Sequence, residues 1–102
     1  MLVYVMPRQP EGKLSKRIQA YLRGRGAYVF KVHGSEFQEP GTPDLLCCYR
    51  GHFIGLELKM PGEKPSPKQV YIMGLIREAG GVAHVASSID DVERILERMP
   101  EK

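Results

Sequence analysis

The stretch GTPDLLCCYRGHFIGLELKMPG, residues 41–62, decides the fold. It holds two β-prone segments, residues 44–49 and 52–60, with only Arg50 and Gly51 between them. Such a short connection containing glycine is typical of a tight turn between antiparallel strands. The stretch therefore predicts a β-hairpin, and its second strand is unusual because it carries two charged residues among apolar ones.

That second strand alternates with the period of two that side chains follow along a strand. The face expected to join the core carries Ile54, Leu56, Leu58 and Met60. The opposite face carries Phe53, Gly55, Glu57 and Lys59. Glu57 and Lys59 thus point the same way, roughly 7 Å apart along the strand.

Asp44 opens the neighbouring strand of the hairpin, so its carboxylate can converge with that of Glu57. Two close carboxylates repel, and one takes a proton unless a cation neutralises them. Magnesium suits one or two carboxylates together with water and a substrate phosphate, and the Leu58 carbonyl could be a further ligand. Lys59 would then polarise the attacking water or steady phosphate charge. Spacing alone equally allows a solvated strand face, with cross-strand pairs worth about a few tenths of a kcal/mol.

The rest of the chain predicts further elements around the hairpin, from helical apolar spacing, short β-prone runs and Gly, Pro or Ser breaks. They are a helix over 11–25, a strand over 28–32, a loop over 33–43, a helix from Ser66-Pro67 to about 79, a strand over 82–86, and a last helix capped by Ser87 or Ser88. The order α-β-β-β-α-β-α favours an α/β fold, with a mixed sheet flanked by helices.

Size and composition predict a single domain over residues 1–102, with 1–10 as an N-terminal arm or strand. The net charge of +3 weakly favours a polyanionic binding partner. No apolar run approaches the ~20 residues that a membrane span needs. Cys47 and Cys48 are adjacent, so they should lie on opposite strand faces and not pair, and lone thiols indicate a reducing cytosol.

Pro43-Asp44, followed thirteen residues later by Glu57-Leu58-Lys59, resembles the PD-(D/E)xK motif of the restriction-endonuclease-like nucleases. Four further stretches resemble the VRR-NUC (virus-type replication-repair nuclease) branch, in particular its small stand-alone members from phages and bacteria. They are HGS at 33–35, GTPDLL at 41–46, ELKMPGEKPSPKQ at 57–69 and AGGVAHV at 79–85. The resemblance covers about residues 11–96 and implies the restriction-endonuclease-like αβββαβ core, here with a C-terminal helix.

The resemblance also implies catalytic roles, which fall on Glu11, Asp44, Glu57, Lys59 and Gln69. Asp44 and Glu57 would be the metal-binding acids, Lys59 the catalytic lysine, and Glu11 a further acid near the metal. Gln69 and Glu11 lie outside the motif, and for each of them a purely structural role is an alternative.

Gln69 lies on the same side of its helix as Ile72 and Met73, yet Ser66 to Gln69 also fits a capping box. Glu11 shares a face with Leu14, but a first-turn acid also complements the helix dipole.

Several residues near the motif could contact substrate, although loop residues of these types are usually only solvated. They are His33, Ser35, Lys31, Lys64 and Lys68.

The family resemblance implies a magnesium-dependent DNA endonuclease in which Mn²⁺ can replace Mg²⁺, acting on branched DNA as a Holliday junction resolvase. Two symmetric cuts need a homodimer, and the apolar residues 1–6 are expected at its interface. A flap, nick or duplex repair nuclease is an alternative, and so is a non-catalytic DNA-binding module. The expected location is the cytosol of a bacterium or of a phage-infected host, with no membrane association.

Overall fold

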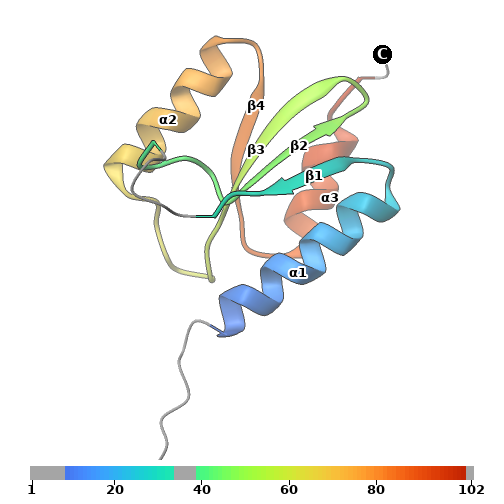
Figure 1. The fold of residues 1–102 in the computed structure, drawn as a ribbon, viewed down its shortest axis with the longest axis horizontal. Helices are drawn as coiled ribbons and strands as arrows, with labels where there is room; N and C mark the ends of the chain where they lie inside the picture. The colour runs from blue at the N-terminus through green and yellow to red at the C-terminus, as the bar shows by residue number, and fades with distance from the viewer. Residues whose placement is uncertain (1–8, 34–38, 101–102) are drawn as a thin grey trace, which may run out of the picture.

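The computed structural model describes residues 9–33 and 39–100 of the chain. The element order matches the predicted one, and the α/β fold class is confirmed (Figure 1). The elements are α1 (Gln9–Gly24), β1 (Tyr28–Lys31), β2 (Leu45–Tyr49), β3 (His52–Leu58), α2 (Pro67–Glu78), β4 (Val82–Ala86) and α3 (Ile89–Glu97).

The four strands form one mixed sheet in the order β1-β2-β3-β4. The first two pairings are antiparallel, and β4 pairs with β3 in parallel. The predicted hairpin joins β2 to β3, and its turn residues Arg50 and Gly51 have φ values of 52° and 81°. Positive φ at both central residues gives a turn whose twist matches that of the two strands.

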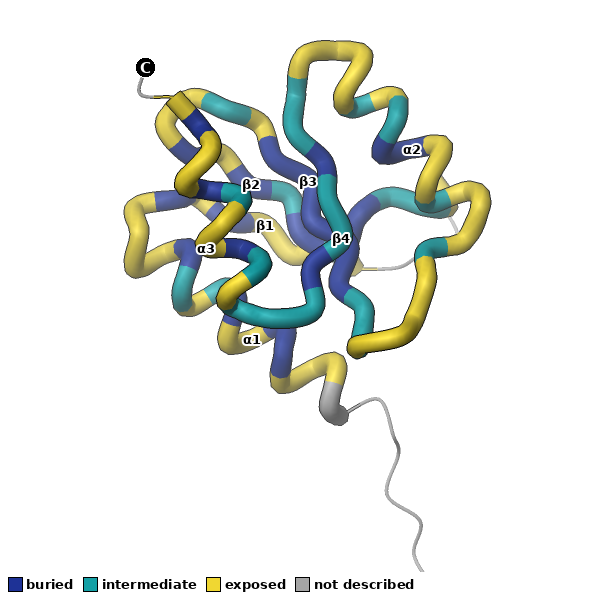
Figure 2. The backbone as a smooth tube through the Cα atoms, turned by 180° about the vertical axis from the view of Figure 1, so that it is seen from behind, coloured by how far each residue is buried: buried dark blue, intermediate teal, exposed yellow. Residues whose placement is uncertain are grey.

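The helices form layers on both sides of the sheet. In Figure 1, α1 and α3 lie together on one side, and α2 lies on the other. The crossover from β3 through α2 to β4 is the helical connection that a parallel strand pair needs. Figure 2 shows that the buried backbone runs through the sheet and along the inner sides of α1 and α3. The core there contains Leu14, Ile18, Leu22, Leu45, Ile54, Leu56, Val92 and Leu96.

From Ile54 to Leu58 both faces of β3 are covered, which corrects the alternative of a solvated strand face at Glu57. On the α2 side, a Cβ atom added to Gly55 would lie 3.0 Å from both Pro43 Cγ and Ile76 Cδ1. Glycine therefore lets the Pro43 loop and α2 approach the strand closely. Glu57, two residues along on the same face, is 2% exposed.

Element boundaries differ from the predicted ones by a few residues. The strand predicted over 52–60 ends at Leu58, although Lys59 N still donates to Ala86 O at 3.1 Å. Helix α1 begins at Gln9, so residues 9 and 10 are helical rather than part of an arm. The apolar residues 1–6, predicted at a dimer interface, lie outside the described residues. Of the two candidate caps of the last helix, Ser88 is the cap.

The two cysteines lie as predicted: Cys47 is buried, Cys48 is exposed, and both are free. Burial raises the pKa of the Cys47 thiol to about 11, so this residue acts as a small apolar core side chain. None of the helices in the described ranges has the length and apolar content that crossing a bilayer demands.

Candidate active site

Asp44 lies immediately before β2, at the end of the sheet where β3 finishes. Its Oδ2 accepts a hydrogen bond from the backbone N–H of Leu58 at 2.8 Å. Pro43, which precedes it, is fully buried against the sheet. The buried proline and this cross-strand bond together hold the Asp44 carboxylate beside Glu57.

Glu57 is a buried carboxylate with one satisfied oxygen. Its Oε2 accepts from Gln69 Nε2 at 2.8 Å and lies 3.8 Å from Lys59 Nζ. Its Oε1 is buried and has no hydrogen-bond partner within the described part of the chain. Burial is the main cause that raises the Glu57 pKa to about 7, and the nearby Asp44 charge adds to it while Lys59 opposes it. An unmet oxygen on a buried acid indicates a group that a cation could satisfy.

Gln69 caps α2, and its side chain also reaches Glu57. Its backbone N–H donates to Ser66 Oγ at 3.1 Å, and its Oε1 accepts from Ser66 N at 2.8 Å. This is a complete capping box at the start of α2. Because the cap uses only Oε1, the Nε2 group of the same amide is left to donate to Glu57. The cap therefore fixes the orientation of the group that holds Glu57.

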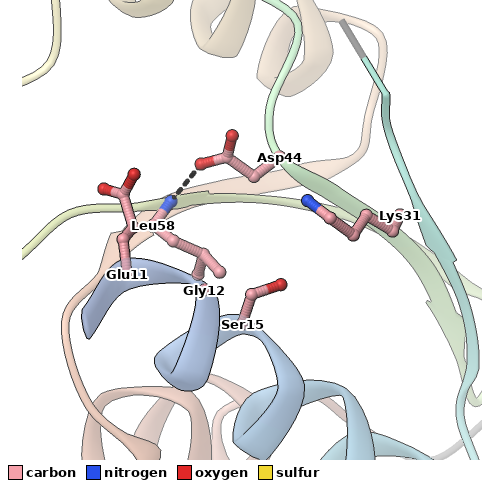
Figure 3. A pocket seen from close by; sticks show the side chains of 6 residues that line it. All are labelled: Glu11, Gly12, Ser15, Lys31, Asp44 and Leu58. Atoms are coloured by element: carbon pink, nitrogen blue, oxygen red, sulfur yellow. Dashed lines mark hydrogen bonds between the residues drawn. The ribbon is translucent and has the colours of Figure 1, made fainter. Parts of the chain in front are cut away.

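A cavity of about 240 Å³ opens beside these residues. Its lining residues, shown in Figure 3, are Glu11, Gly12, Ser15, Lys31, Asp44 and Leu58. They come from the first two turns of α1, the end of β1, and the ends of β2 and β3. Glu57 does not line this cavity itself. Two of its neighbours, Asp44 and Leu58, do line it, and the Asp44 charge acts on the Glu57 carboxylate.

Glu11 reaches the cavity wall from the first turn of α1, with its side chain exposed. Its charge also contributes, as the smallest of the causes, to the raised pKa of Glu57. Ser15, which was not among the predicted site residues, lines the same cavity, is 5% exposed and accepts a hydrogen bond from Gln19 Nε2 at 3.0 Å. Its position four residues after Glu11 on the buried stripe is the signal that could have identified it.

The donor set fits a hard divalent cation that takes most of its ligands from water and substrate. Two carboxylates converge, one with an unmet buried oxygen, and Mg²⁺ commonly uses one or two carboxylates in this way. In the described ranges, no group of three or more His, Cys, Asp or Glu side chains is placed to hold an ion. Glu11 as a further ligand, and the Leu58 carbonyl, therefore stay predictions.

The predicted substrate-contacting residues are spread out. Lys31 points into the cavity from β1 (Figure 3). Lys68 lies in the first turn of α2, with its Nζ 3.8 Å from Glu39 Oε2 and 5.8 Å from the Tyr71 ring centre. His33 and Lys64 are exposed and do not line the cavity. Ser35 lies outside the described residues.

Solved structures of known proteins share this fold. A VRR_NUC domain is 28% identical, with a TM-score of 0.74, over 89% of this chain and 98% of that one. A second VRR_NUC domain protein is 20% identical, with a TM-score of 0.69, over 86% of this chain and 85% of that one. Hjc from Archaeoglobus fulgidus, a Holliday junction resolvase, is 21% identical, with a TM-score of 0.60, over 76% of this chain and 67% of its own.

A scan of protein-family models and a search of curated proteins both gave no match. The structural likeness nevertheless confirms the predicted resemblance to the VRR-NUC domain.

Proposed function

We propose that this chain, whose structure resembles VRR_NUC domains, is a metal-dependent endonuclease that hydrolyses DNA phosphodiester bonds. The observation that carries the proposal is the state of Glu57. This carboxylate is buried, lies beside Asp44 and Lys59, and keeps an unmet oxygen within the described residues. Burying an acid in this way costs stability. A site that binds a cation gives a reason for that cost.

Asp44 and Glu57 would hold the cation, with the Leu58 carbonyl and Glu11 as further predicted ligands. When bound, Mg²⁺, or Mn²⁺ in its place, supplies positive charge that activates the attacking water and stabilises charge developing on the phosphate oxygens. Both ions accept the same oxygen ligands.

The chain itself contributes orientation and charge. Gln69 holds Glu57 by Oε2 and so leaves Oε1 to the ligand. The Leu58 N–H holds Asp44 in the same way. Lys59, whose side chain is 20% exposed, is the cation best placed to assist the attacking water. Lys31 on the cavity wall is placed to meet a phosphate of the bound strand.

Branched DNA is the proposed substrate, and a Holliday junction the first choice within it. The support is the fold shared with Hjc, which is a Holliday junction resolvase. One chain carries one Asp44–Glu57 pair, so paired cuts in opposed strands require a homodimer with two such sites. The free cysteines favour a cytosolic location.

Cleavage of four substrates of equal length would test the proposal: a four-way junction, a 5′ flap, a duplex and a single strand, each with Mg²⁺ and with EDTA. Wild type is compared with Glu57→Gln, which keeps the size of the side chain but removes its charge. Glu93→Gln, on the exposed side of α3, is the matched control.

Paired symmetric nicks in the junction, absent in EDTA and in Glu57→Gln but kept in Glu93→Gln, are the expected result. Cutting of flap or duplex as readily as the junction would keep the chemistry and remove the resolvase assignment. Binding without any cutting would instead identify a non-catalytic DNA-binding module.

A further inference from the structure

We propose that Ser15 and Lys31 form a subsite for one phosphate of the substrate strand, on the side of the sheet opposite to Glu57. The proposal rests on the proposed function and deepens it, because it assigns a second ligand group beside the acidic pair. Both residues line the cavity of about 240 Å³ shown in Figure 3. Pockets for drug-sized ligands measure about 300–1,000 Å³, so this cavity suits a single small group.

The sheet separates the subsite from the Glu57 carboxylate. Lys31 pairs with Leu45 across β1 and β2, and Leu45 pairs with Leu56 across β2 and β3. Paired residues point to the same face of a sheet, so Lys31 lies on the face that α1 and α3 cover. Glu57 follows Leu56 directly and points to the α2 face. Asp44 connects the two regions, because it lines the cavity and its charge acts on Glu57.

The Ser15 hydroxyl is buried, and its proton has no acceptor among the described residues. Its Oγ accepts a hydrogen bond from Gln19 Nε2 at 3.0 Å. A serine inside a helix can donate to the carbonyl oxygen four residues earlier, but the described ranges contain no such bond for Ser15. The residue is 5% exposed and lines the cavity, so the hydroxyl is able to donate there. A buried donor without an acceptor destabilises the fold, and a ligand oxygen would satisfy it.

The cavity has a donor end and an acidic end. Figure 3 shows Ser15 Oγ and Lys31 Nζ pointing into the same part of the cavity. The Glu11 carboxylate points instead towards the end where Asp44 accepts the Leu58 N–H. The Glu11 charge also contributes to the raised pKa of Glu57, which groups it with the acidic pair. An anion is therefore favoured at the Ser15 and Lys31 end and disfavoured at the other.

A phosphate of DNA is the anion that these donors fit. Among the described residues, Lys31 forms no salt bridge with an acid. Lysine and serine side chains are common donors to the phosphate oxygens of DNA. The cation and the reacting phosphate would occupy the acidic end, where Asp44 and Glu57 lie. The donor end would then hold a neighbouring phosphate of the same strand and fix the strand's position over the acids.

Gln19 is the positioning residue of this subsite. Its amide N–H donates to Ser15 Oγ, so the hydroxyl proton is left for a ligand. Gln19 lies one turn after Ser15 on α1 and is partly buried. A carboxylate in place of this amide would accept the Ser15 proton instead of donating to its oxygen. The hydroxyl would then turn away from the phosphate, which makes its direction testable.

Fluorescence anisotropy of labelled four-way junctions in EDTA tests the assignment, since the branch point fixes where the protein binds. In each junction one phosphate is replaced by a neutral methylphosphonate, at successive positions along one strand. For wild type, one position should weaken binding by about 10-fold, the size expected for a hydrogen bond to a charged group. In Ser15→Ala and in Lys31→Gln, the unmodified junction should bind more weakly, and that position should no longer matter.

Matched variants separate the subsite from general charge. Lys31→Arg keeps the cation and should keep the sensitive position. Lys16→Gln, at an exposed position of α1 outside the cavity, should weaken binding of all junctions alike and leave the position sensitive. Gln19→Glu should behave as Ser15→Ala does. Ala20→Glu adds the same charge on the exposed side of α1 and should retain the sensitive position.

Two outcomes would overturn the subsite: a wild type without a sensitive position, including one that binds no junction, or a position that stays sensitive in Ser15→Ala. If Ser15→Ala lowers only the unfolding free energy, the serine is structural. If it changes only the Mg²⁺ concentration for half-maximal cleavage, Ser15 acts at the metal instead. Because binding is measured in EDTA, the two proposals fail separately. A protein with the sensitive position that cuts nothing overturns only the nuclease, and a nuclease without that position overturns only the subsite.

Discussion

From Ile54 to Leu58 the two faces of β3 are both buried, but they are built from different residues. Towards α1 and α3 the strand presents Ile54, Leu56 and Leu58, each at most 2% exposed and all apolar. Towards α2 it presents Gly55, which permits close packing, and Glu57, which is equally buried and charged. One face lowers the free energy of folding by burying hydrocarbon, while the other buries a carboxylate with an unmet oxygen.

With Glu57 in the proposed catalytic role, stability and function would be divided between the two faces within seven residues of one strand. Substitutions on the apolar face should act on folding, and substitutions on the acidic face should act on cleavage. The predictions below test that separation, from the largest expected effect to the smallest.

Glu57→Gln should lower the cleavage rate by about 10²–10³-fold or more, because an electrostatic group aimed at the reacting phosphate is removed. At neutral pH without metal, the same variant should be at least as stable as wild type, since a neutral amide replaces a buried carboxylate. Rates on labelled DNA and urea unfolding measure the two effects. A variant that is less stable but fully active would remove the distinction between the two faces.

Leu56→Ala should have the opposite profile. Leu56 is 1% exposed at the centre of the core, so its truncation should cost about 2–5 kcal/mol of unfolding free energy. Urea unfolding by circular dichroism gives this value, and Met60→Ala, at a partly buried position after the strand, should cost less. An equal cost at both positions would mean that the core does not centre on β3.

The pH dependence of the unfolding free energy should isolate the cost of burying the Glu57 carboxylate. The Glu57 pKa rises from an ordinary 4.5 to about 7 in the folded chain, so folding is least penalised below 4.5, where both states are protonated. As pH rises from 4.5 through 7, the unfolded state ionises first. The unfolding free energy should then fall by an amount on the order of 3 kcal/mol.

Unfolding in EDTA between pH 4 and 8, for wild type beside Glu57→Gln, would measure this loss as the difference between the two curves. Saturating Mg²⁺ should restore stability at the upper end, because a cation that binds only the folded state favours it. Parallel curves for the two proteins would show that the Glu57 pKa is not raised.

The smallest effects are expected at the start of α2, where two variants should distinguish the capping contact of Gln69 from its contact with Glu57. Ser66→Ala removes only the cap hydroxyl and should cost about 1 kcal/mol of stability with cleavage retained. Gln69→Ala also removes the hydrogen bond to Glu57 Oε2 and should reduce cleavage as well. Comparing unfolding midpoints and rates for the two variants would show whether Gln69 acts beyond the cap. Equal rates in both would leave it a capping residue.

Local patterns predicted much of this arrangement. Period-two alternation and Arg50-Gly51 predicted the hairpin, and Ser66-Pro67 predicted the start of α2, because these signals depend on residues close in the chain. The family resemblance identified Asp44, Glu57 and Lys59 as a group. The structure places Asp44 beside Glu57 and the Lys59 ammonium 3.8 Å from it, while their catalytic roles stay predictions.

The sequence by itself determined which residues share a face of β3; what covers each face was decided only by the tertiary structure. Alternation assigns Glu57 and Gly55 to one side, but it cannot say that α2 and Pro43 pack there and exclude water from the acid. The same holds for Ser15 in the cavity wall and for the exposure of Tyr28 and Phe53. Burial depends on contacts between elements far apart in the chain, and a local pattern does not contain them.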